Sequence, residues 1–392
     1  MHTIHLPYDE ITDDEITDGA SDAPFPTQRE GAVETVRVAL CTDRAAWDAY
    51  VARAGGSLLQ SWPWGAFKRQ QGWRTLRLVA LRDGDPCAAL QVLTRRVPGV
   101  GAFLYAAEGP VLPAADWANG AASLGPLLAA ARRYGQGIGA LALRVDPLTP
   151  AAPAAEALAA HGLRRGPANV QPAVTAVLDL SPSEDALLAG CDRGARRLLR
   201  YARRDGVTVR PGAPADIAPF ARWIAETGRR KGFGVRDEAY VRGLDATFRA
   251  YNSGDFFVAE RAGAPIAAML AAPFGARYFA LYCASSAEGR RVSAQYLIQW
   301  TALMHAKRLG CRLYDFRGMA ATDDPADPWA GLSFFKTRLG ARREESPGAW
   351  DDVYRPLAYN GMVWAQRTRR AWRARAHRAT GDTQTAGGAH AR

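Results

Sequence analysis

The hydrophobic pattern in the first half of the chain predicts a small sheet followed by one helix. Short, mainly apolar segments over 76–81, 87–94, 103–107 and 140–146 are predicted as β-strands. Asp83-Gly84, between the first two strands, predicts a hairpin turn. A helical period covers 127–134, and Gly135 is expected to cap that helix at its C-terminus.

The second half repeats this order of elements. Strands are predicted over 256–260, 266–271, 278–284 and 312–316, with a turn at Ala262-Gly263. A helix is predicted over 294–309, and Gly310 is expected to cap it. A hairpin-rich sheet followed by one helix and one more strand is typical of an acyltransferase-type α/β domain. The repeat therefore predicts two such domains in tandem.

A segment rich in Gly, Pro, Arg and Asn at 162–172 separates the two halves. Beyond it, the sequence predicts a strand over 176–180 and a helix after Ser181-Pro182. That helix carries a wide cationic surface made by Arg193, Arg196, Arg197, Arg200, Arg203 and Arg204. Two interpretations of this surface stay open, a solvated helix face or an RNA contact.

Length and charge indicate two domains that attract polyanions. A chain of 392 residues exceeds the size at which one core usually keeps growing. The net charge is +11, and residues 1–30 carry eight carboxylates against one arginine, so the other 362 residues carry +18. We interpret 1–30 and 377–392 as disordered tails. The basic body favours tRNA, nucleotide phosphates or anionic lipid head groups, the alternative being excess solvated charge.

The scarcity of cysteine and histidine argues against metal sites and histidine triads. The five cysteines are scattered singly, which is typical of a reducing compartment without disulfides or structural zinc. Outside the termini only His161 and His305 remain, and packing or capping is expected for each. No run of eighteen apolar residues occurs, so we expect a cytoplasmic protein whose basic helix ends permit peripheral contact with the inner membrane surface.

Lys336 is the candidate catalytic residue. Only four of the 50 cationic side chains are lysines, and Lys336 follows both a strand end at 314–318 and a loop rich in Pro and Asp. A compact ammonium group can stabilise a developing oxyanion, whereas an arginine fork fits carboxylates and phosphates. The alternative is an ordinary surface lysine. Asp315 is a candidate base, although pairing with Arg317 or Arg338 is the simpler interpretation.

A series of motifs occurs between residues 58 and 364. They are Leu59-Gln60-Ser61-Trp62, Trp64 with Phe67-Lys68, Glu108-Gly109-Pro110-Val111, Arg144-Val145-Asp146-Pro147, Val170-Gln171-Pro172, Leu178-Asp179-Leu180, Gly232-Phe233-Gly234-Val235-Arg236 with Tyr240, Tyr282, Tyr314-Asp315-Phe316-Arg317-Gly318, and Phe335-Lys336 before Leu339-Gly340. In this order and spacing they resemble the Fem (FemABX) family of peptidoglycan bridge-forming aminoacyltransferases.

The resemblance implies an α/β (α+β) fold with two tandem acetyltransferase-like (GNAT-type) domains, in which helices flank mixed sheets. It also implies that the C-terminal segment returns to the first domain. We place the first domain at 31–172 plus 352–376 and the second at 173–351. Some members carry a long helical arm, but no heptad stretch here is long enough for a coiled coil.

Family members transfer an amino acid from aminoacyl-tRNA to the stem-peptide amine of a peptidoglycan precursor muropeptide, and the resemblance implies this activity here. The tRNA ester is already activated, so the enzyme mainly juxtaposes amine and ester and stabilises an oxyanion. By matching position, Lys336 would stabilise the oxyanion and Phe335 would contact the acceptor end of the tRNA. A monomer without cofactor or metal suffices for this chemistry.

The remaining matched positions concern the precursor. Arg236 and Tyr240 match the pair that holds its phosphates, with Lys68 joining them, and Tyr282 and Asp146 match residues that line its channel. Other roles stay open: an ion pair with the next two residues for Arg236, a turn cap for Asp146 and simple packing for Tyr282.

Two other functions share the predicted fold or charge. An N-acyltransferase using acyl-CoA needs a Gly-rich pyrophosphate-binding turn, but bulky Val292 stands in the corresponding segment, 289–294. A non-catalytic binder of RNA or anionic surfaces would depend on the +18 body and would bind RNA regardless of aminoacylation.

Overall fold

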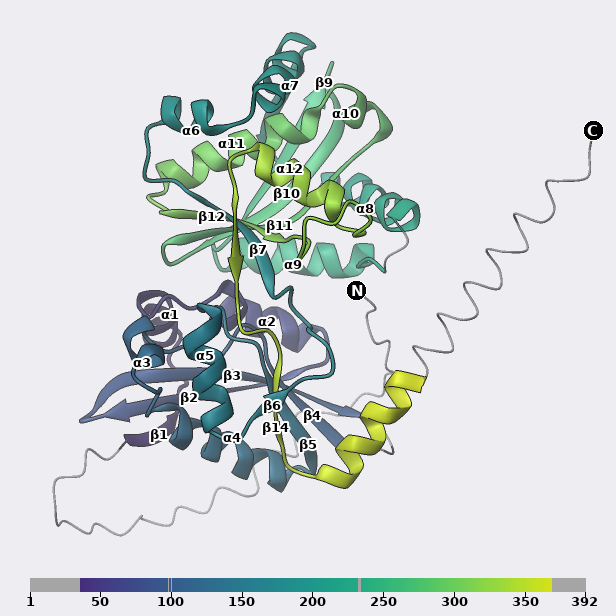
Figure 1. Cartoon of the computed structure of the whole chain (residues 1–392). Coiled ribbons are helices and arrows are strands. Elements are labelled where there is room, and N and C mark those ends of the chain that lie inside the picture. Colours follow the sequence, from purple (N-terminus) through teal and green to yellow (C-terminus); the bar gives the residue numbers. More distant parts are fainter. Residues whose placement is uncertain (1–35, 98, 100, 232–233, 369–392) are drawn as a thin grey trace, which may run out of the picture.

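The computed structural model describes residues 36–97, 99, 101–231 and 234–368, which form two lobes stacked one above the other (Figure 1). Both predicted tails, at 1–30 and 377–392, lie outside the described residues. The same holds for Gly232-Phe233 of the motif before Arg236, and for 369–376 at the end of the predicted first domain.

Each lobe is built on a seven-stranded sheet. The first sheet contains, in spatial order, β1 (Val36–Leu40), β2 (Arg74–Arg82), β3 (Asp85–Val97), β4 (Gly101–Ala106), β5 (Ala140–Val145), β14 (Trp350–Val353) and β6 (Arg164–Arg165). The second contains β13 (Arg342–Glu345), β7 (Val174–Asp179), β12 (Leu313–Gly318), β11 (Arg277–Ser285), β10 (Ala264–Phe274), β9 (Asp255–Arg261) and β8 (Val207–Pro211).

The two sheets share one plan. Strands that follow one another in sequence pair antiparallel from β1 to β4 and from β8 to β11. The next pair is parallel in each sheet, β4 with β5 and β11 with β12. Parallel neighbours need a crossover, which α4 (Leu124–Gly137) and α11 (Ala294–Arg308) provide. The predicted repeat of hairpins, one helix and one further strand is therefore confirmed.

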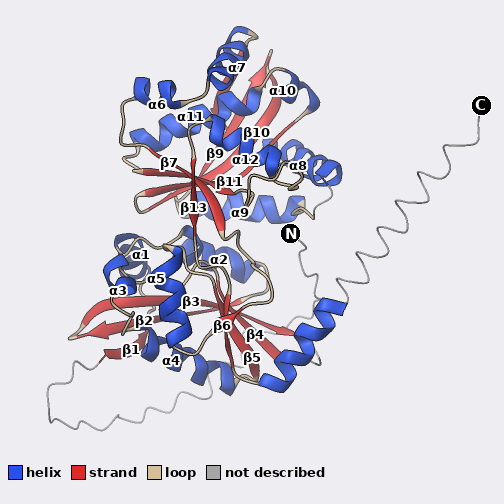
Figure 2. Cartoon of the chain, viewed as in Figure 1, coloured by secondary structure: helices blue, strands red, loops and turns tan. Residues whose placement is uncertain are grey.

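Helices flank both sheets (Figure 2). Those of the first lobe are α1 (Arg44–Arg53), α2 (Trp62–Gln70), α3 (Ala114–Ala118), α4 and α5 (Ala151–Ala160). Those of the second lobe are α6 (Glu184–Gly190), α7 (Arg193–Arg204), α8 (Ile217–Lys231), α9 (Glu238–Ala250), α10 (Ala287–Arg291), α11 and α12 (Ala330–Arg338). A last helix covers 356–368.

A two-stranded antiparallel connection joins the lobes. β6 leads up into β7, β13 leads back down into β14, and each outgoing strand pairs with the returning one. In the first sheet β14 also pairs with β5, and Arg144 donates Nε and Nη2 to the Asp351 carboxylate at 2.7 Å each. The chain after β13 is thus held to the first lobe by both backbone and side-chain bonds.

A hydrophobic cluster spans the interface between the lobes. It joins Phe67 and Tyr105 of the first lobe to Phe220, Tyr240 and Phe279 of the second, all of them buried. Burying a side chain of this size stabilises by roughly 1.5–3 kcal/mol relative to exposure. The lobes therefore share a core, which fixes the residues that face each other across it.

One of the two predicted glycine caps is wrong. Gly135 lies inside α4, which continues to Gly137. A glycine is needed there because a Cβ would lie only 2.4 Å from Tyr354 Cε2. The left-handed position falls instead on Gly139, with φ +69°. Gly310, with φ +79°, follows α11 as predicted.

The helix predicted after Ser181-Pro182 is two helices. Ser183 caps α6, and Asp192 caps α7 by accepting from the backbone N–H of Ala195 at 2.6 Å. Cys191 between them has an extended backbone with ψ of 146°, which ends α6.

Candidate active site at the lobe interface

Lys336 lies on α12, and its ammonium group is buried against the end of β12. The residue is 5% exposed, and Nζ donates to the backbone oxygens of Arg317, at 3.1 Å, and Gly318. Burial lowers the pKa of Lys336 to about 7, while Asp315 raises this pKa and Arg317 lowers it. Two acceptors serve three N–H donors, so within the described structure one donor is left for a ligand.

Arg317 links the wall of this lysine site to the first lobe. Its backbone lies in the left-handed region, with φ +66°, and its N–H donates to Asp315 Oδ1 at 2.6 Å. Its side chain crosses the interface, where Nη2 donates to Glu108 Oε1 at 2.6 Å and to Gln171 Oε1 at 3.4 Å. Because Arg317 also supplies one of the two carbonyls that hold Lys336, the ion pair between the lobes helps to position the ammonium group.

Asp146 anchors the Glu108 end of that ion pair. Asp146 is 3% exposed and accepts from the Glu108 N–H at 2.7 Å, the Tyr105 hydroxyl at 2.8 Å and the Gln171 N–H at 3.3 Å. Burial raises the pKa of Asp146 to about 7, although these donors lower it. Asp146 thus holds the backbone of Glu108, which is left-handed with φ +52°, and the Glu108 side chain in turn pairs with Arg317.

Asp315 lies between two arginines. The sequence suggested one of them, Arg317, but not the other, Arg277. Arg277 on β11 donates Nη1 to Asp315 Oδ2 at 3.2 Å, and Arg317 Nη1 lies 3.9 Å from the same oxygen. Arg338 pairs instead with Asp192, at 2.8 Å. A fully buried carboxylate between two guanidinium groups is a poor general base, so the geometry favours a structural role for Asp315.

A cleft of about 560 Å³ opens between the lobes beside this ion network. Glu108 lines it from the first lobe, and Arg277 and Glu344 line it from the second, with Arg277 Nη2 donating to Glu344 at 2.7 Å. Lys336 does not line this cleft and is joined to it through Arg317 and its partner Glu108.

Four other predicted residues meet where α2 contacts α9. Lys68 Nζ lies 5.6–5.8 Å from the centroids of four surrounding rings. The Arg236 guanidinium lies 4.6 Å from the Tyr240 ring centroid, and the Tyr240 and Tyr282 centroids are 6.4 Å apart. We define the cation–aromatic cluster as Lys68, Arg236, Tyr240 and Tyr282 with the rings of Trp64, Phe67 and Trp73.

The cations of this cluster repel one another. Burial lowers the pKa of Lys68 to about 8, and the nearby charges of Arg236 and Arg95 lower it further. The carboxylates next to Arg236 in sequence are used elsewhere, since Asp237 caps α9 and Glu238 pairs with Arg242. The geometry therefore does not support a local ion pair for Arg236, and an added anion would relieve the repulsion.

Tyr282 joins the two groups of residues. Its ring makes an edge contact with Tyr240 and packs against the hydrophobic cluster that contains Phe279. The Arg317 guanidinium also lies 5.7 Å from the Phe279 ring centroid. A continuous set of contacts thus leads from Arg236 on one side of the interface to the residue that holds Lys336.

The two phenylalanines before Lys336 face different environments. Phe335 is half-buried and packs edge-on against Tyr296, with ring centroids 4.8 Å apart. Phe334 is 61% exposed. Adjacent helix residues point about 100° apart, so one of the pair packs inward while the other faces solvent.

Comparison with known proteins agrees with this architecture. Residues 190–329 match the acetyltransferase (GNAT) domain family. A lipid II:glycine glycyltransferase of Staphylococcus aureus (strain USA300) is 24% identical over 390 residues, covering 80% of this chain and 92% of the relative. A crystal structure of FemX has a TM-score of 0.75 at 21% identity, covering 83% of this chain and 100% of that chain. In sequence and fold this chain is similar to the FemABX family of aminoacyltransferases.

The predicted fold of two tandem GNAT-type domains with mixed sheets flanked by helices is confirmed. A tandem GNAT protein from the clavulanic acid biosynthesis pathway shares it, with a TM-score of 0.52 at 15% identity over 82% of this chain and 99% of that chain. Among the described helices the longest, α8 and α11, have 15 residues each, so this part of the chain contains no long helical arm.

No helix in the described ranges is long and apolar enough to span a bilayer. The same residues contain no group of three or more His, Cys, Asp or Glu side chains arranged to hold a metal ion.

Sequence reasoning missed two residues of this site. Arg317 and Glu108 lie within motifs that the sequence singles out, yet neither was assigned a role at the interface. Their side chains meet across 209 positions of sequence, and nothing in the local pattern around either one indicates its partner.

Proposed function

We propose that this protein transfers an amino acid from aminoacyl-tRNA to the stem-peptide amine of a peptidoglycan precursor, either a UDP-linked or a lipid-linked muropeptide. The similarity to FemX and to the glycyltransferase supports the reaction class, and the name of the glycyltransferase supports the acceptor class. The observation that carries the proposal is the buried ammonium of Lys336, which is held by two carbonyls and retains one N–H donor.

The chemistry needs no nucleophilic side chain. The neutral acceptor amine attacks the ester carbonyl carbon, giving a tetrahedral intermediate whose oxygen carries the negative charge. Lys336 donates its third N–H to that oxygen, in a site where low solvent exposure strengthens the interaction. Collapse of the intermediate breaks the bond to the ribose oxygen, which leaves as a hydroxyl with a proton, while the nitrogen loses a proton and becomes an amide.

The cation–aromatic cluster is the proposed binding site for the precursor's phosphates. Arg236 offers a fork for bidentate contact, and Lys68 adds a point charge that is already partly desolvated by surrounding rings. Tyr240 and Tyr282 pack in the same hydrophobic cluster as Phe279, whose ring lies 5.7 Å from the Arg317 guanidinium. A precursor anchored there by its phosphates would extend its stem peptide toward Lys336.

The acyl-CoA alternative finds little support at the turn before α11. A pyrophosphate site needs free backbone N–H groups at a helix N-terminus. Here the N–H groups of Arg290, Val292 and Ser293 donate to oxygens of α10 and its cap, and the Val292 side chain is buried in the core. The segment from Gly289 to Ala294 therefore consists of the end of α10 and the short turn that leads into α11.

The proposed reaction can be tested directly. The protein is incubated with a labelled pool of mixed aminoacyl-tRNA and with each of the two acceptor types, and the products are identified by mass. We expect one acceptor to gain the mass of one or more aminoacyl residues, and omission of the tRNA should abolish the product. Product formation with acyl-CoA but not with aminoacyl-tRNA would contradict the proposal.

A further inference from the structure

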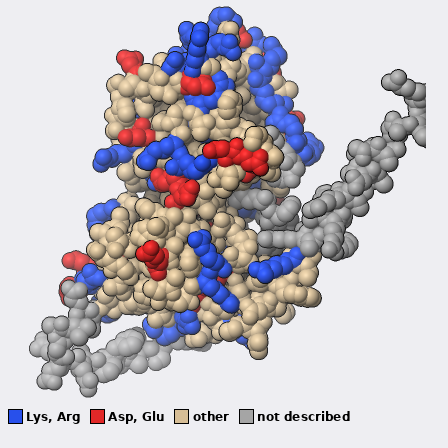
Figure 3. Space-filling model, viewed as in Figure 1, with Lys and Arg blue, Asp and Glu red and all other residues tan. Residues whose placement is uncertain are grey.

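Helix α7 presents one continuous row of arginines to solvent. Arg193, Arg197, Arg200 and Arg204 follow one another at intervals of four, three and four residues, which places them within an arc of about 60° on one helix face. The row extends for about 16 Å along the helix axis at 1.5 Å per residue. All four residues are exposed, and Lys and Arg side chains gather over this end of the upper lobe (Figure 3). We call these four residues the arginine row.

The opposite face of α7 is buried in the second lobe. Ala195, Leu199 and Ala202 pack in its hydrophobic core. Three members of the arginine row, Arg193, Arg197 and Arg200, form no ion pair with any carboxylate in the described structure, and Arg204 has only a 3.8 Å contact with Asp205. The row is therefore a fixed line of positive charge that internal partners do not neutralise.

The start of the arginine row is bonded to the helix that carries Lys336. Asp192, the N-cap of α7, accepts from Arg338 Nε on α12 at 2.8 Å, and its backbone N–H donates to the Arg338 oxygen at 2.9 Å. Gly194 leaves room for this contact, since a Cβ there would lie 1.7 Å from Arg338 Nη2. Arg338 lies two residues after Lys336 on α12, so the start of the row is bonded to the helix that carries the proposed transfer site.

The exposed face of α12 carries an aromatic ring next to Arg338, the residue bonded to the start of the row. Phe334 is 61% exposed, and the Arg338 guanidinium lies 5.2 Å from its ring centroid. An exposed ring next to cationic side chains is the arrangement on which unpaired bases stack. A row of arginines that leads to such a ring matches a nucleic acid with a paired stem and an unpaired end.

We propose that the arginine row binds the sugar–phosphate backbone of the base-paired acceptor arm of the donor RNA, and that the unpaired end passes Phe334 to reach Lys336. This inference rests on the proposed function, because it assigns the donor's path to that same site. An anionic membrane is the less fitting partner. A helix that lies in a bilayer surface inserts its apolar face, and the apolar face of α7 is already buried in the lobe.

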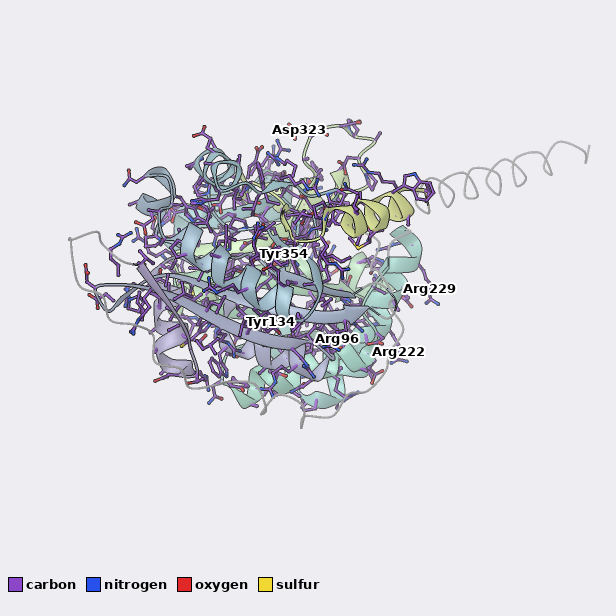
Figure 4. The ribbon with its side chains drawn as sticks, turned by 90° about the horizontal axis from the view of Figure 1, so that it is seen from below. Arg96, Tyr134, Arg222, Arg229, Asp323 and Tyr354 are labelled. Atoms are coloured by element: carbon purple, nitrogen blue, oxygen red, sulfur yellow. The ribbon has the colours of Figure 1, made fainter. Side chains whose placement is uncertain are left out.

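The test compares two double variants with equal changes of charge. Arg197→Glu/Arg200→Glu alters the arginine row, and Arg222→Glu/Arg229→Glu alters two exposed arginines on α8. In Figure 4, Arg222 and Arg229 lie on one side of the molecule, and Asp323, in the loop before α12, lies on another. Each protein is titrated with an RNA hairpin of acceptor-arm length that carries no amino acid at its end. The titration is repeated over a range of salt concentrations.

We expect the row variant to bind the hairpin at least about tenfold more weakly than the parent at moderate salt, with a salt slope reduced by roughly two, because each lost phosphate contact removes about one unit. The α8 variant should bind within about twofold of the parent. Equal losses in both variants, or no loss in the row variant, would overturn the proposal.

Two further measurements separate this inference from the proposed function. With a minimal donor, an aminoacyl ester of a short unpaired oligonucleotide, the row variant should transfer at the parent rate. A loss with this donor as well would mean that the row is not a stem-binding surface. If the parent itself transfers from neither donor, the proposed function fails, and the hairpin titration still decides whether the row binds RNA.

Vesicles of phosphatidylglycerol and phosphatidylethanolamine provide the last arm. The row variant should sediment with these vesicles as the parent does. Loss of vesicle binding with unchanged hairpin affinity would assign the row to a membrane and overturn the RNA proposal.

Discussion

The interface between the lobes contains two groups of cations that differ in what surrounds them. Around Arg317 each guanidinium has a carboxylate partner, Glu108 or Asp315, and Asp315 also pairs with Arg277. In the cation–aromatic cluster, Lys68 and Arg236 are surrounded by rings and by other cations. Paired charges hold a structure in place, whereas cations without a carboxylate partner gain most from an incoming anion.

Lys336 combines features of both groups. It is buried as deeply as the paired residues, yet it is held by backbone oxygens rather than by a carboxylate. The paired network positions the carbonyls, and the lysine keeps a donor for a transient charge. We therefore propose a positioning role for Arg317, phosphate binding for Lys68 and Arg236, and oxyanion stabilisation for Lys336.

The largest effect is expected for Lys336→Met. Loss of one oxyanion donor typically lowers kcat by about 10²–10³-fold, and donor RNA affinity should change little because Lys336 is buried. Lys307→Met is a matched control, since Lys307 Nζ also donates to two backbone oxygens, those of Leu180 and Pro182, at 2.8 and 2.7 Å. Single-turnover rates at pH 6.5 measure both, and equal losses in the two variants would contradict the assignment.

Arg317→Met is expected to destabilise the protein more than it changes substrate affinity. It leaves Glu108, which is 4% exposed, without its cation, and breaking a buried ion pair from one side costs about 3–5 kcal/mol. Urea unfolding measures the change in the free energy of unfolding. The double variant Arg317→Met/Glu108→Gln should recover part of the loss, and a loss below about 1 kcal/mol in the single variant would argue against a positioning role.

Arg236→Ala should raise KM for the precursor by about tenfold or more with little change in kcat, because a hydrogen bond to a charged group contributes about 1.5–3 kcal/mol. Arg242→Ala, which removes an arginine of α9 already paired with Glu238, is the control and should leave KM unchanged. Steady-state kinetics with varied precursor distinguish the two variants. An unchanged KM for Arg236→Ala would exclude a phosphate contact.

A smaller effect is expected from the titration of Lys68. Its lowered pKa of about 8 means that it is cationic below this pH and loses its charge as the pH rises through 8. Precursor affinity should therefore fall by up to about tenfold between pH 7 and pH 9, and the Lys68→Ala variant should lack this fall. Calorimetric titration at several pH values gives both curves, and parallel curves would show that Lys68 does not contact the anion.

The repeated fold was predictable because each lobe is built from local hairpins, whose alternating pattern and turn residues are contiguous in sequence. Lys336 was identifiable because lysine is rare in this chain and follows a strand end. The linker at 162–172 and the return of the C-terminal segment were expected, but the strand pairing between them was not, since β6 has only two residues and is defined by its partner β14. The Gly135 error has the same origin, because only the folded packing shows that Tyr354 excludes a Cβ there.

Charge pairing shows the same limit. The sequence placed Asp315 near an arginine but could not choose among the candidates, and the dominant partner, Arg277, comes from the neighbouring parallel strand β11. Long-range pairs such as Arg317 with Glu108 depend on how the lobes meet. Local patterns therefore identified chemical groups, and tertiary packing decided which of them are neutralised.

The most direct test of the account is the pH dependence of the Lys336 contribution. Above its lowered pKa of about 7, Lys336 loses the proton that stabilises the oxyanion. The ratio of parent to Lys336→Met single-turnover rates cancels the titration of the acceptor amine. This ratio should be constant at low pH and fall by up to about tenfold per pH unit once the pH exceeds the pKa of Lys336 in the substrate complex. A ratio that stays constant from pH 6 to pH 10, or that rises with pH, would contradict a catalytic role for the ammonium group.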